Sequence, residues 1–169
     1  MWDVRDETPD DAEGIRAVHT SAFAPSPVEA KLVDDLRTQD ALVQDLCLVA
    51  TEDDAVIGHI AFSRATLDSG HEILVLAPMA VLPEHQRKGV GCQLIGQSMR
   101  RAALTDFPLV SVVGHADYFP QFGFEQAAPL GIEAPFDVPQ EAWMARRLAR
   151  YTDEARGKVT YAEAFAGTV

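Results

Sequence analysis

The segment that most constrains this chain is a strand-like apolar run followed by a glycine turn and a helix-like run. The apolar run is Ile73 to Leu82, the turn is Gln86-Arg87-Lys88-Gly89-Val90-Gly91, and the helical periodicity begins near Val90. Glycines let the backbone approach a ligand closely, and a helix start offers unpaired N–H groups at the positive end of its dipole. Arg87 and Lys88 add two cations at the same place. The segment therefore predicts a binding site for a phosphate or pyrophosphate group.

Spacing separates the phosphate-binding loops that this segment could form. A P-loop requires a Lys-Ser/Thr pair after its last glycine, and nothing after Gly91 supplies it. A dinucleotide fingerprint requires a third glycine, and Leu94 stands at that position. The pattern that remains is Gln-x-x-Gly-x-Gly, from Gln86 to Gly91. It resembles the acyl-CoA pyrophosphate loop of the GNAT acyltransferases.

Other segments resemble this family in the correct order along nearly the whole chain. They narrow the resemblance to a branch of small bacterial-type, single-domain GNAT proteins. The matching segments are Ala22-Phe23, Glu29 to Arg37, Leu76 to Glu84, Tyr118 to Phe124, and Gly157 to Tyr161 with Phe165. The resemblance implies one N-acetyltransferase domain over residues 1–169. It also implies transfer of acetyl from acetyl-CoA to an amine of a small molecule or a protein.

The hydrophobic pattern predicts an α/β fold whose order, βααβββαβαβ, is that of the GNAT acyl-CoA N-acyltransferase fold. Hairpins dominate, so we expect a mixed, mostly antiparallel central sheet flanked by helices. The expected strands are Trp2 to Asp6, Leu46 to Thr51, Ala55 to Arg64, Glu72 to Leu82, Leu109 to Val113 and Trp143 to Leu148. The expected helices run from Ile15 to Ala22, Ala30 to Leu36 and Val90 to Leu104, with one helical turn at Ala116 to Gln121. Ser26 and Glu29 predict a capping box, and the proline-rich stretch from Ala127 to Pro139 predicts a surface loop.

Composition excludes several classes of function. With 169 residues, 47% of them hydrophobic, the chain suits one compact domain. A formal net charge of −12 argues against nucleic-acid or membrane partners; it could favour a cationic amine substrate or serve solubility alone. No apolar run approaches the roughly 20 residues of a membrane span, and no signal-like segment opens the chain, so we expect a cytoplasmic protein. The expected partners are acyl-CoA and an amine acceptor, and a homodimer is left open.

The cysteines predict neither a metal site nor a disulfide. Cys47 and Cys92 fit a reducing compartment, and no Cys/His cluster has metal-ligand spacing. Cys47 lies in an apolar run and is expected in the core. Cys92 falls in the first turn of the helix after the glycines, where a thiolate would be favoured, although packing explains it equally well.

The family resemblance implies how the acyl-CoA is held. The backbone N–H groups from Arg87 through Lys88, Gly89, Val90 and Gly91 to Cys92 would cradle the pyrophosphate, with Gln86 orienting the loop. Arg87 and Lys88 either touch a phosphate or form a solvated pair. Main-chain groups of Met79, Ala80 and Val81 would meet the pantetheine arm, and an amide near Ala80 or Val81 would polarise the thioester. Pro78 fits because it has no N–H to donate to a neighbouring strand.

The base that takes the amine proton is ambiguous in the sequence. The candidates are Glu29, Glu84, His115 and Asp117. His115 has a suitable ordinary pKa, but it also reads as a polar residue closing a strand. Glu29 matches the branch motif, but the capping box also explains it. A base acting through water, or an amine that arrives neutral, stays open.

The donor to the departing thiolate is the point where this chain departs from the family. A Tyr usually stands four residues before the glycine of the Gly-Phe pair, and that position here, counted back from Gly123, is Phe119. Tyr118 is adjacent, but on a helical turn it would point about 100° away. Either Tyr118 is re-aimed and serves as a catalytic residue, another donor serves, or catalysis is impaired. The alternative function is therefore a non-catalytic acyl-CoA-binding or sensor module.

His59 belongs to a strand whose alternation places it with Ala61 and Ser63 on one face. Ile60 and Phe62 lie on the other face. The polar face could meet the acceptor cleft, and it could equally be exposed to solvent.

Overall fold

The structure is a computed structural model that describes residues 1–168. Its sheet has the strand order β1-β2-β3-β4-β5-β8-β6, with β9 against β3 and β7 against β9. Only β4 with β5 and β7 with β9 run parallel among the named strand pairs. The strands are β1 (Asp3–Asp6), β2 (Leu48–Glu52), β3 (Ala55–Leu67), β4 (Glu72–Val81), β5 (Leu109–Val113), β6 (Glu125–Gln126), β7 (Ile132–Glu133), β8 (Trp143–Arg147) and β9 (Gly157–Thr160). The expected mixed, mostly antiparallel sheet is confirmed.

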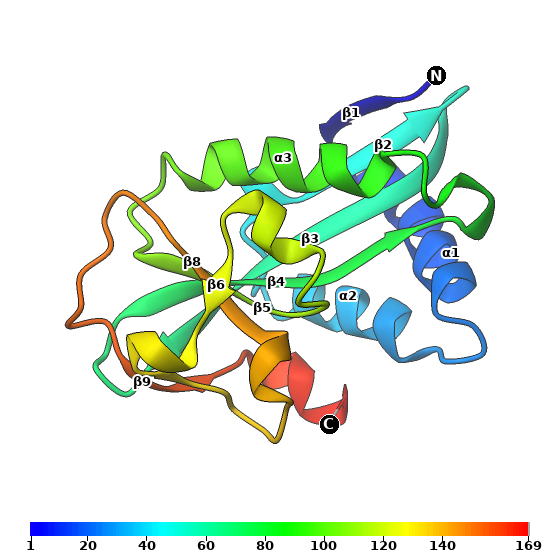
Figure 1. Ribbon diagram of the computed structural model, residues 1–169. Coiled ribbons are helices and arrows are strands. Elements are labelled where there is room, and N and C mark those ends of the chain that lie inside the picture. The colour runs from blue at the N-terminus through cyan, green and yellow to red at the C-terminus, as the bar shows by residue number, and fades with distance from the viewer. Residues whose placement is uncertain (169) are drawn as a thin grey trace.

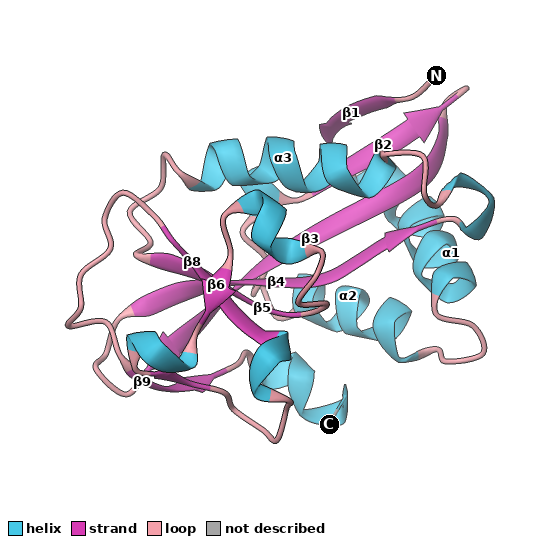
Figure 2. Cartoon of the chain, viewed as in Figure 1, coloured by secondary structure: helices cyan, strands magenta, loops and turns pink. Residues whose placement is uncertain are grey.

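Three α-helices of the described residues cover the two faces of this sheet. They are α1 (Ala12–Ala22), α2 (Val28–Thr38) and α3 (Val90–Ala102). Figure 1 shows α3 on one side of the sheet and α1 with α2 on the other, and Figure 2 shows the same arrangement by element type. No helix in this part of the chain combines the length and the apolar character that a membrane crossing requires.

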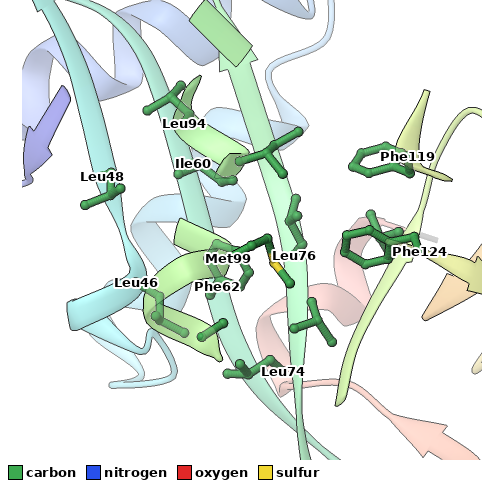
Figure 3. Close-up of a cluster of buried hydrophobic side chains, with 14 of the residues drawn as sticks. Leu46, Leu48, Ile60, Phe62, Leu74, Leu76, Leu94, Met99, Phe119 and Phe124 are labelled. Carbon is green, nitrogen blue, oxygen red and sulfur yellow. The ribbon is translucent and has the colours of Figure 1, made fainter. Parts of the chain in front are cut away.

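Alternation along β3 decides which residues face which helices. Ile60 and Phe62 point into the cluster that contains Leu94 and Met99 of α3 (Figure 3). Ala61, one residue out of phase, belongs instead to the cluster formed with α2. Successive side chains of a strand point to opposite faces, so a single strand supplies both halves of the core.

The sheet opens at the edge of β4, and this opening positions the site. β4 pairs with β5 only at Leu74–Val110 and Val75–Ser111, whereas it stays paired with β3 up to Val81. In the pairing with β3, Ala77 and Pro78 stand opposite Ala61 alone, which is a β-bulge. Bulges bend a strand and disrupt its ladder locally. Beyond Val75, the β5 side of β4 is therefore free to receive a ligand.

Three local expectations are corrected by the structure. The stretch from Ala127 to Pro139 contains β7, whose Ile132 is buried and accepts a hydrogen bond from the Trp143 indole at 2.9 Å, so it is not simply a surface loop. The strands β6, β7 and β9 were missed because two to four residues are too few to show a period. The Ser26–Glu29 capping box does not form, because Ser26 Oγ accepts from the Val28 N–H and Glu29 makes no cap contact.

Candidate active site

A first cavity of about 350 Å³ lies between the end of β4, the glycine turn and the start of α3. Most of the residues expected to hold acyl-CoA line it. These are Met79, Ala80, Val81, Gln86, Arg87, Gly89, Gly91 and Cys92. The expected holding residues Lys88 and Val90 do not line it: Lys88 is exposed, and the Val90 side chain is buried in the core beneath α3. For Val90, only the backbone can face a ligand.

The turn has the geometry of an anion site. Arg87 has φ 64° and Gly89 has φ 98°, so the chain reverses through the left-handed region before α3 begins. Gly89 is the N-cap of α3, and the first N–H groups of a helix have no carbonyl of a preceding turn to bind. Gln86 donates its side-chain amide to the Val81 carbonyl at 2.9 Å, which ties the turn to β4. The Val81 carbonyl is thus already hydrogen-bonded. The main-chain groups of Met79 and Ala80 are left on the open side of β4.

Tyr118 reaches this cavity although Phe119 holds the sequence position where the family pattern places a tyrosine. Its hydroxyl lies 3.6 Å from the Cys92 sulfur. Burial raises the pKa of Tyr118, and the contact with Cys92 raises it further, so the phenol keeps its proton at neutral pH. Phe119 is buried beside Phe124 and packs against Gly114, where any Cβ would clash with its ring. Of these two neighbouring aromatic residues, Tyr118 is the one that lines the first cavity.

A second cavity of about 520 Å³ adjoins the first. It is lined by the first turn of α2, the bulge of β4, the end of β5 and the C-terminal segment. Phe23 and Met79 line both cavities. The two spaces therefore meet at the open edge of β4, where an acyl group and an acceptor would have to meet.

Of the four candidate bases, two line the second cavity and two lie outside both cavities. Glu29 and His115 line the second cavity. The Glu29 Oε1 atom is buried and has no hydrogen-bond partner among the described residues, whereas His115 is exposed. Glu84 and Asp117 are exposed and line neither of these two cavities. The geometry retains the first two residues as candidates.

His59 is fully buried and is not exposed to solvent. Its Nε2 lies 2.8 Å from Glu7 Oε1, and its Nδ1 lies 2.9 Å from His19 Nε2. Glu7 also forms an ion pair with Arg37. Since a carboxylate only accepts, His59 Nε2–H donates to Glu7, and a second hydrogen bond joins His59 Nδ1 to His19 Nε2. The network joins β3, α1, α2 and the segment after β1, next to the site.

The pKa values in this network follow from burial. Burial and the neighbouring His59 lower the pKa of His19 to about 3, so His19 stays neutral. Burial raises the pKa of Glu7, but the hydrogen bonds from His59 and Arg37 outweigh burial, so its pKa is lowered overall. Sequence reasoning missed this network because its members are 40 and 52 residues apart and no local pattern joins them.

Phe23 and His85 also line the first cavity without having been predicted to do so. Phe23 carried a signal, since the Ala22-Phe23 pair belongs to the branch pattern, and its ring stacks on His19 at 6.1 Å. His85 bonds Glu52 at 3.1 Å, a contact that no motif indicates. Cys47 is buried as expected, and burial raises the pKa of its thiol to about 12. In the described part of the chain, no group of three or more His, Cys, Asp or Glu side chains could hold a metal ion.

Comparison with known proteins settles the family. A family model described as an acetyltransferase (GNAT) domain matches residues 44–126. The Escherichia coli K12 protein named uncharacterized N-acetyltransferase YjhQ is 37% identical over 160 residues, which are 90% of this chain and 88% of that protein. This chain belongs to the GNAT acetyltransferase family. The resemblance inferred from the motifs is confirmed, and so is N-acetyltransferase activity as the family's function.

Two solved structures agree over nearly the whole chain. The GNAT family N-acetyltransferase YhbS from Escherichia coli, solved in complex with CoA, has a TM-score of 0.88 and 32% identity, covering 97% of this chain and 91% of its own. A GNAT family acetyltransferase from Brucella melitensis, solved in complex with acetyl-CoA, has a TM-score of 0.81 and 30% identity, covering 98% of both chains. The GNAT fold expected from the sequence is confirmed.

Proposed function

We propose that this GNAT acetyltransferase binds acetyl-CoA in the first cavity and transfers the acetyl group to an amine held in the second. The observation that carries the proposal is that the two cavities meet at Phe23 and Met79, on the side of β4 that β5 has left open. The complexes of the YhbS and Brucella relatives with CoA and acetyl-CoA support the choice of ligand.

The phosphate loop holds the nucleotide end of the cofactor. Backbone N–H groups from Arg87 to Cys92 bind the pyrophosphate, favoured by the dipole of α3 and by the left-handed turn at Gly89. The exposed Arg87 side chain lines the cavity and adds positive charge. Lys88 contributes through its backbone.

The open edge of β4 holds the acyl end. Main-chain groups of Met79 and Ala80 bind the pantetheine arm on the side away from β3, and Val81 lines the wall. An amide near Ala80 or Val81 donates to the thioester oxygen as negative charge develops there, which is the role of an oxyanion hole.

Transfer then needs a base and an acid, and the chain offers both. The amine nitrogen forms a bond to the carbonyl carbon, the C–S bond breaks, and CoA leaves as a thiolate. Glu29 or His115 takes the surplus proton of the amine, directly or through water. The Tyr118 hydroxyl, protonated at neutral pH, gives a proton to the thiolate and regains one from solvent. The products are an N-acetylated amine and CoA.

We further propose that residues 1–169 act as one acetyltransferase domain in the cytoplasm. Its partners are acyl-CoA and an amine, without nucleic acid or membrane, and the net charge of −12 supports this choice. A homodimer is compatible with the proposal, which requires only one chain per site.

Isothermal titration with acetyl-CoA tests the cofactor, and release of free thiol on a panel of amines tests the transfer. We expect binding, and thiol release that depends on the amine. Absence of binding at millimolar acetyl-CoA would refute the cofactor site. Binding with no release on any amine would favour the alternative, a non-catalytic acyl-CoA sensor.

A further inference from the structure

The second cavity has an unusual composition for a site that receives an amine. Apolar and aromatic side chains form nearly all of its lining, and Glu29 is the single acidic residue among the described residues that line it. His115 is the other titratable side chain apart from the tyrosine. The cavity of about 520 Å³ falls within the size range of small-molecule sites. This lining therefore favours a ligand that carries one charged group on an apolar body.

Glu29 is the strongest indication of that charged group. Its Oε1 atom is buried without a partner in the described structure, and the carboxylate takes no part in capping α2. Buried polar atoms are nearly always hydrogen-bonded, and leaving one unpaired costs stability. An acid in the first turn of α2 is favoured by the helix dipole, but the dipole does not provide a hydrogen bond for the buried oxygen. A cationic ligand that donates to the carboxylate would satisfy it.

The remainder of the cavity offers an aromatic wall. Phe136 packs edge-on against Tyr161 with ring centroids 5.9 Å apart, and Tyr161 packs against Phe165 at 4.7 Å. Burial raises the pKa of Tyr161, so it stays neutral and adds no second anion. Apolar surface of this kind favours a ligand whose body is itself apolar, and rings pack well on rings.

The position of the cavity makes this ligand the acceptor. Phe23 and Met79 belong to both cavities, so a nitrogen near their junction faces the open edge of β4. We infer that the acceptor is a small primary amine with a compact apolar, preferably aromatic, body, whose ammonium group is bound by Glu29. This inference rests on the proposed function, and it names the substrate class of the same site.

Four related probes that differ in the ring, the amine or an added carboxylate test the inference by direct titration of the protein, with and without CoA. They are 2-phenylethylamine, ethanolamine, 2-phenylethanol and phenylalanine. We expect 2-phenylethylamine to bind at least about 10-fold more tightly than ethanolamine, which lacks the ring, and than 2-phenylethanol, which lacks the charge. Phenylalanine should bind more weakly because its carboxylate would approach Glu29. Equal affinities for 2-phenylethylamine and ethanolamine would overturn the inference.

Two variants test separately how binding depends on the charge of the ligand and on its aromatic ring. Glu29→Gln should reduce the preference for 2-phenylethylamine over 2-phenylethanol to within about 3-fold, with little change in melting temperature, because the buried Glu29 Oε1 atom has no hydrogen-bond partner among the described residues. Glu13→Gln is the matched control, since Glu13 is an exposed acid in the first turn of α1. Phe136→Ala should weaken 2-phenylethylamine and leave ethanolamine unchanged. A Glu29→Gln protein that keeps the full preference for the amine would contradict the assignment of Glu29.

Failure of this inference is distinguishable from failure of the proposed function. If acetyl-CoA binds and is used equally well with ethanolamine and 2-phenylethylamine, the substrate class is wrong and the acetyltransferase site stands. If acetyl-CoA does not bind, the proposed function falls, while titration of the amines on the free protein still decides the cavity. A lysine-containing peptide acetylated with a higher kcat/KM than 2-phenylethylamine would assign the cavity to a protein substrate and overturn the inference.

Discussion

Tyr118 lines the first cavity although the family pattern places a tyrosine at the next position in the sequence. Phe119 occupies the position of the family's tyrosine and is buried, while the hydroxyl of Tyr118 lies next to Cys92 in the first cavity. The Cys92 sulfur is the hydrogen-bond partner of the Tyr118 hydroxyl. The proposed role of Tyr118 depends on the proton of its hydroxyl, which a phenylalanine lacks.

Tyr118→Phe tests this assignment. We expect turnover to fall by roughly 10-fold to 1,000-fold, at and below the usual size of an acid–base contribution, with little change in affinity for CoA. The measurements are the rate of thiol release, the melting temperature and the titration of CoA.

Tyr151→Phe is the matched control, because Tyr151 packs under the Arg147 guanidinium and lines neither cavity of the site. If Tyr118 only packs beneath the loop, the mutation would lower the melting temperature and leave turnover per folded molecule unchanged. A normal rate of thiol release would remove Tyr118 from the mechanism.

At the scale of elements, the two glycines of the turn serve different purposes. Gly89 needs its positive φ, which side-chain-bearing residues adopt at a cost. Gly91 has helical geometry, so it is not required for its backbone conformation. It is required because a side chain would fill the cavity: a Cβ there would lie 3.3 Å from the Tyr118 hydroxyl and 3.7 Å from Met79. The sequence motif does not distinguish the two glycines, whereas the structure gives each a different reason to lack a side chain.

Gly91→Val should weaken CoA binding by roughly 10-fold to 100-fold, because the added methyl groups crowd the cavity as overpacking does. Gly96→Val is the matched control, since Gly96 lies on the same helix and a Cβ there meets nothing within 4 Å. Both variants place a β-branched residue in α3, so the effect of that change on the helix is the same. A difference between their affinities for CoA therefore reports how closely CoA approaches Gly91. Titration with CoA measures it, and equal affinities for the two folded variants would show that the phosphate binds elsewhere.

At the scale of the whole molecule, the buried side chains of Glu7, His59 and His19, together with the half-buried Arg37, connect α1 and α2 to the sheet. This network makes the fold sensitive to acid. His19 has a native pKa of about 3 against an ordinary value of 6.5, so below pH 6.5 the unfolded chain binds a proton that the native protein does not. The lowered pKa of Glu7 acts in the same direction at lower pH.

We therefore expect the free energy of unfolding to fall by about 1.4 kcal/mol per pH unit as the pH drops below 6.5. This loss continues toward pH 3 and is absent above pH 6.5. Chemical unfolding between pH 7.5 and 5 measures it above the sequence pI of about 4.7. His19→Gln should flatten the profile, and His71→Gln, on the surface turn beside Ser69, should keep it. A profile that is already flat in the unmodified protein would contradict the burial of a neutral His19.

The sequence by itself determined the fold and predicted a position for the cofactor site, because both rest on short-range patterns. Alternation along β3 and helical spacing in α3 fix which faces are apolar, and these two periods decide how the layers pack. The predicted phosphate loop spans six adjacent residues, Gln86 to Gly91, and its turn is formed locally by left-handed backbone at Arg87 and Gly89.

Only the tertiary structure decided what surrounds the reacting groups. The family spacing assigned the phenol to position 119, whereas the structure buries Phe119 and brings Tyr118 to the first cavity. The sequence explained Glu29 by a capping box, whereas packing leaves its carboxylate unpartnered in an apolar cavity. The sequence left His59 either at the acceptor cleft or exposed to solvent, whereas the fold buries it against His19. These outcomes depend on contacts between residues far apart in the chain, and no local period encodes such contacts.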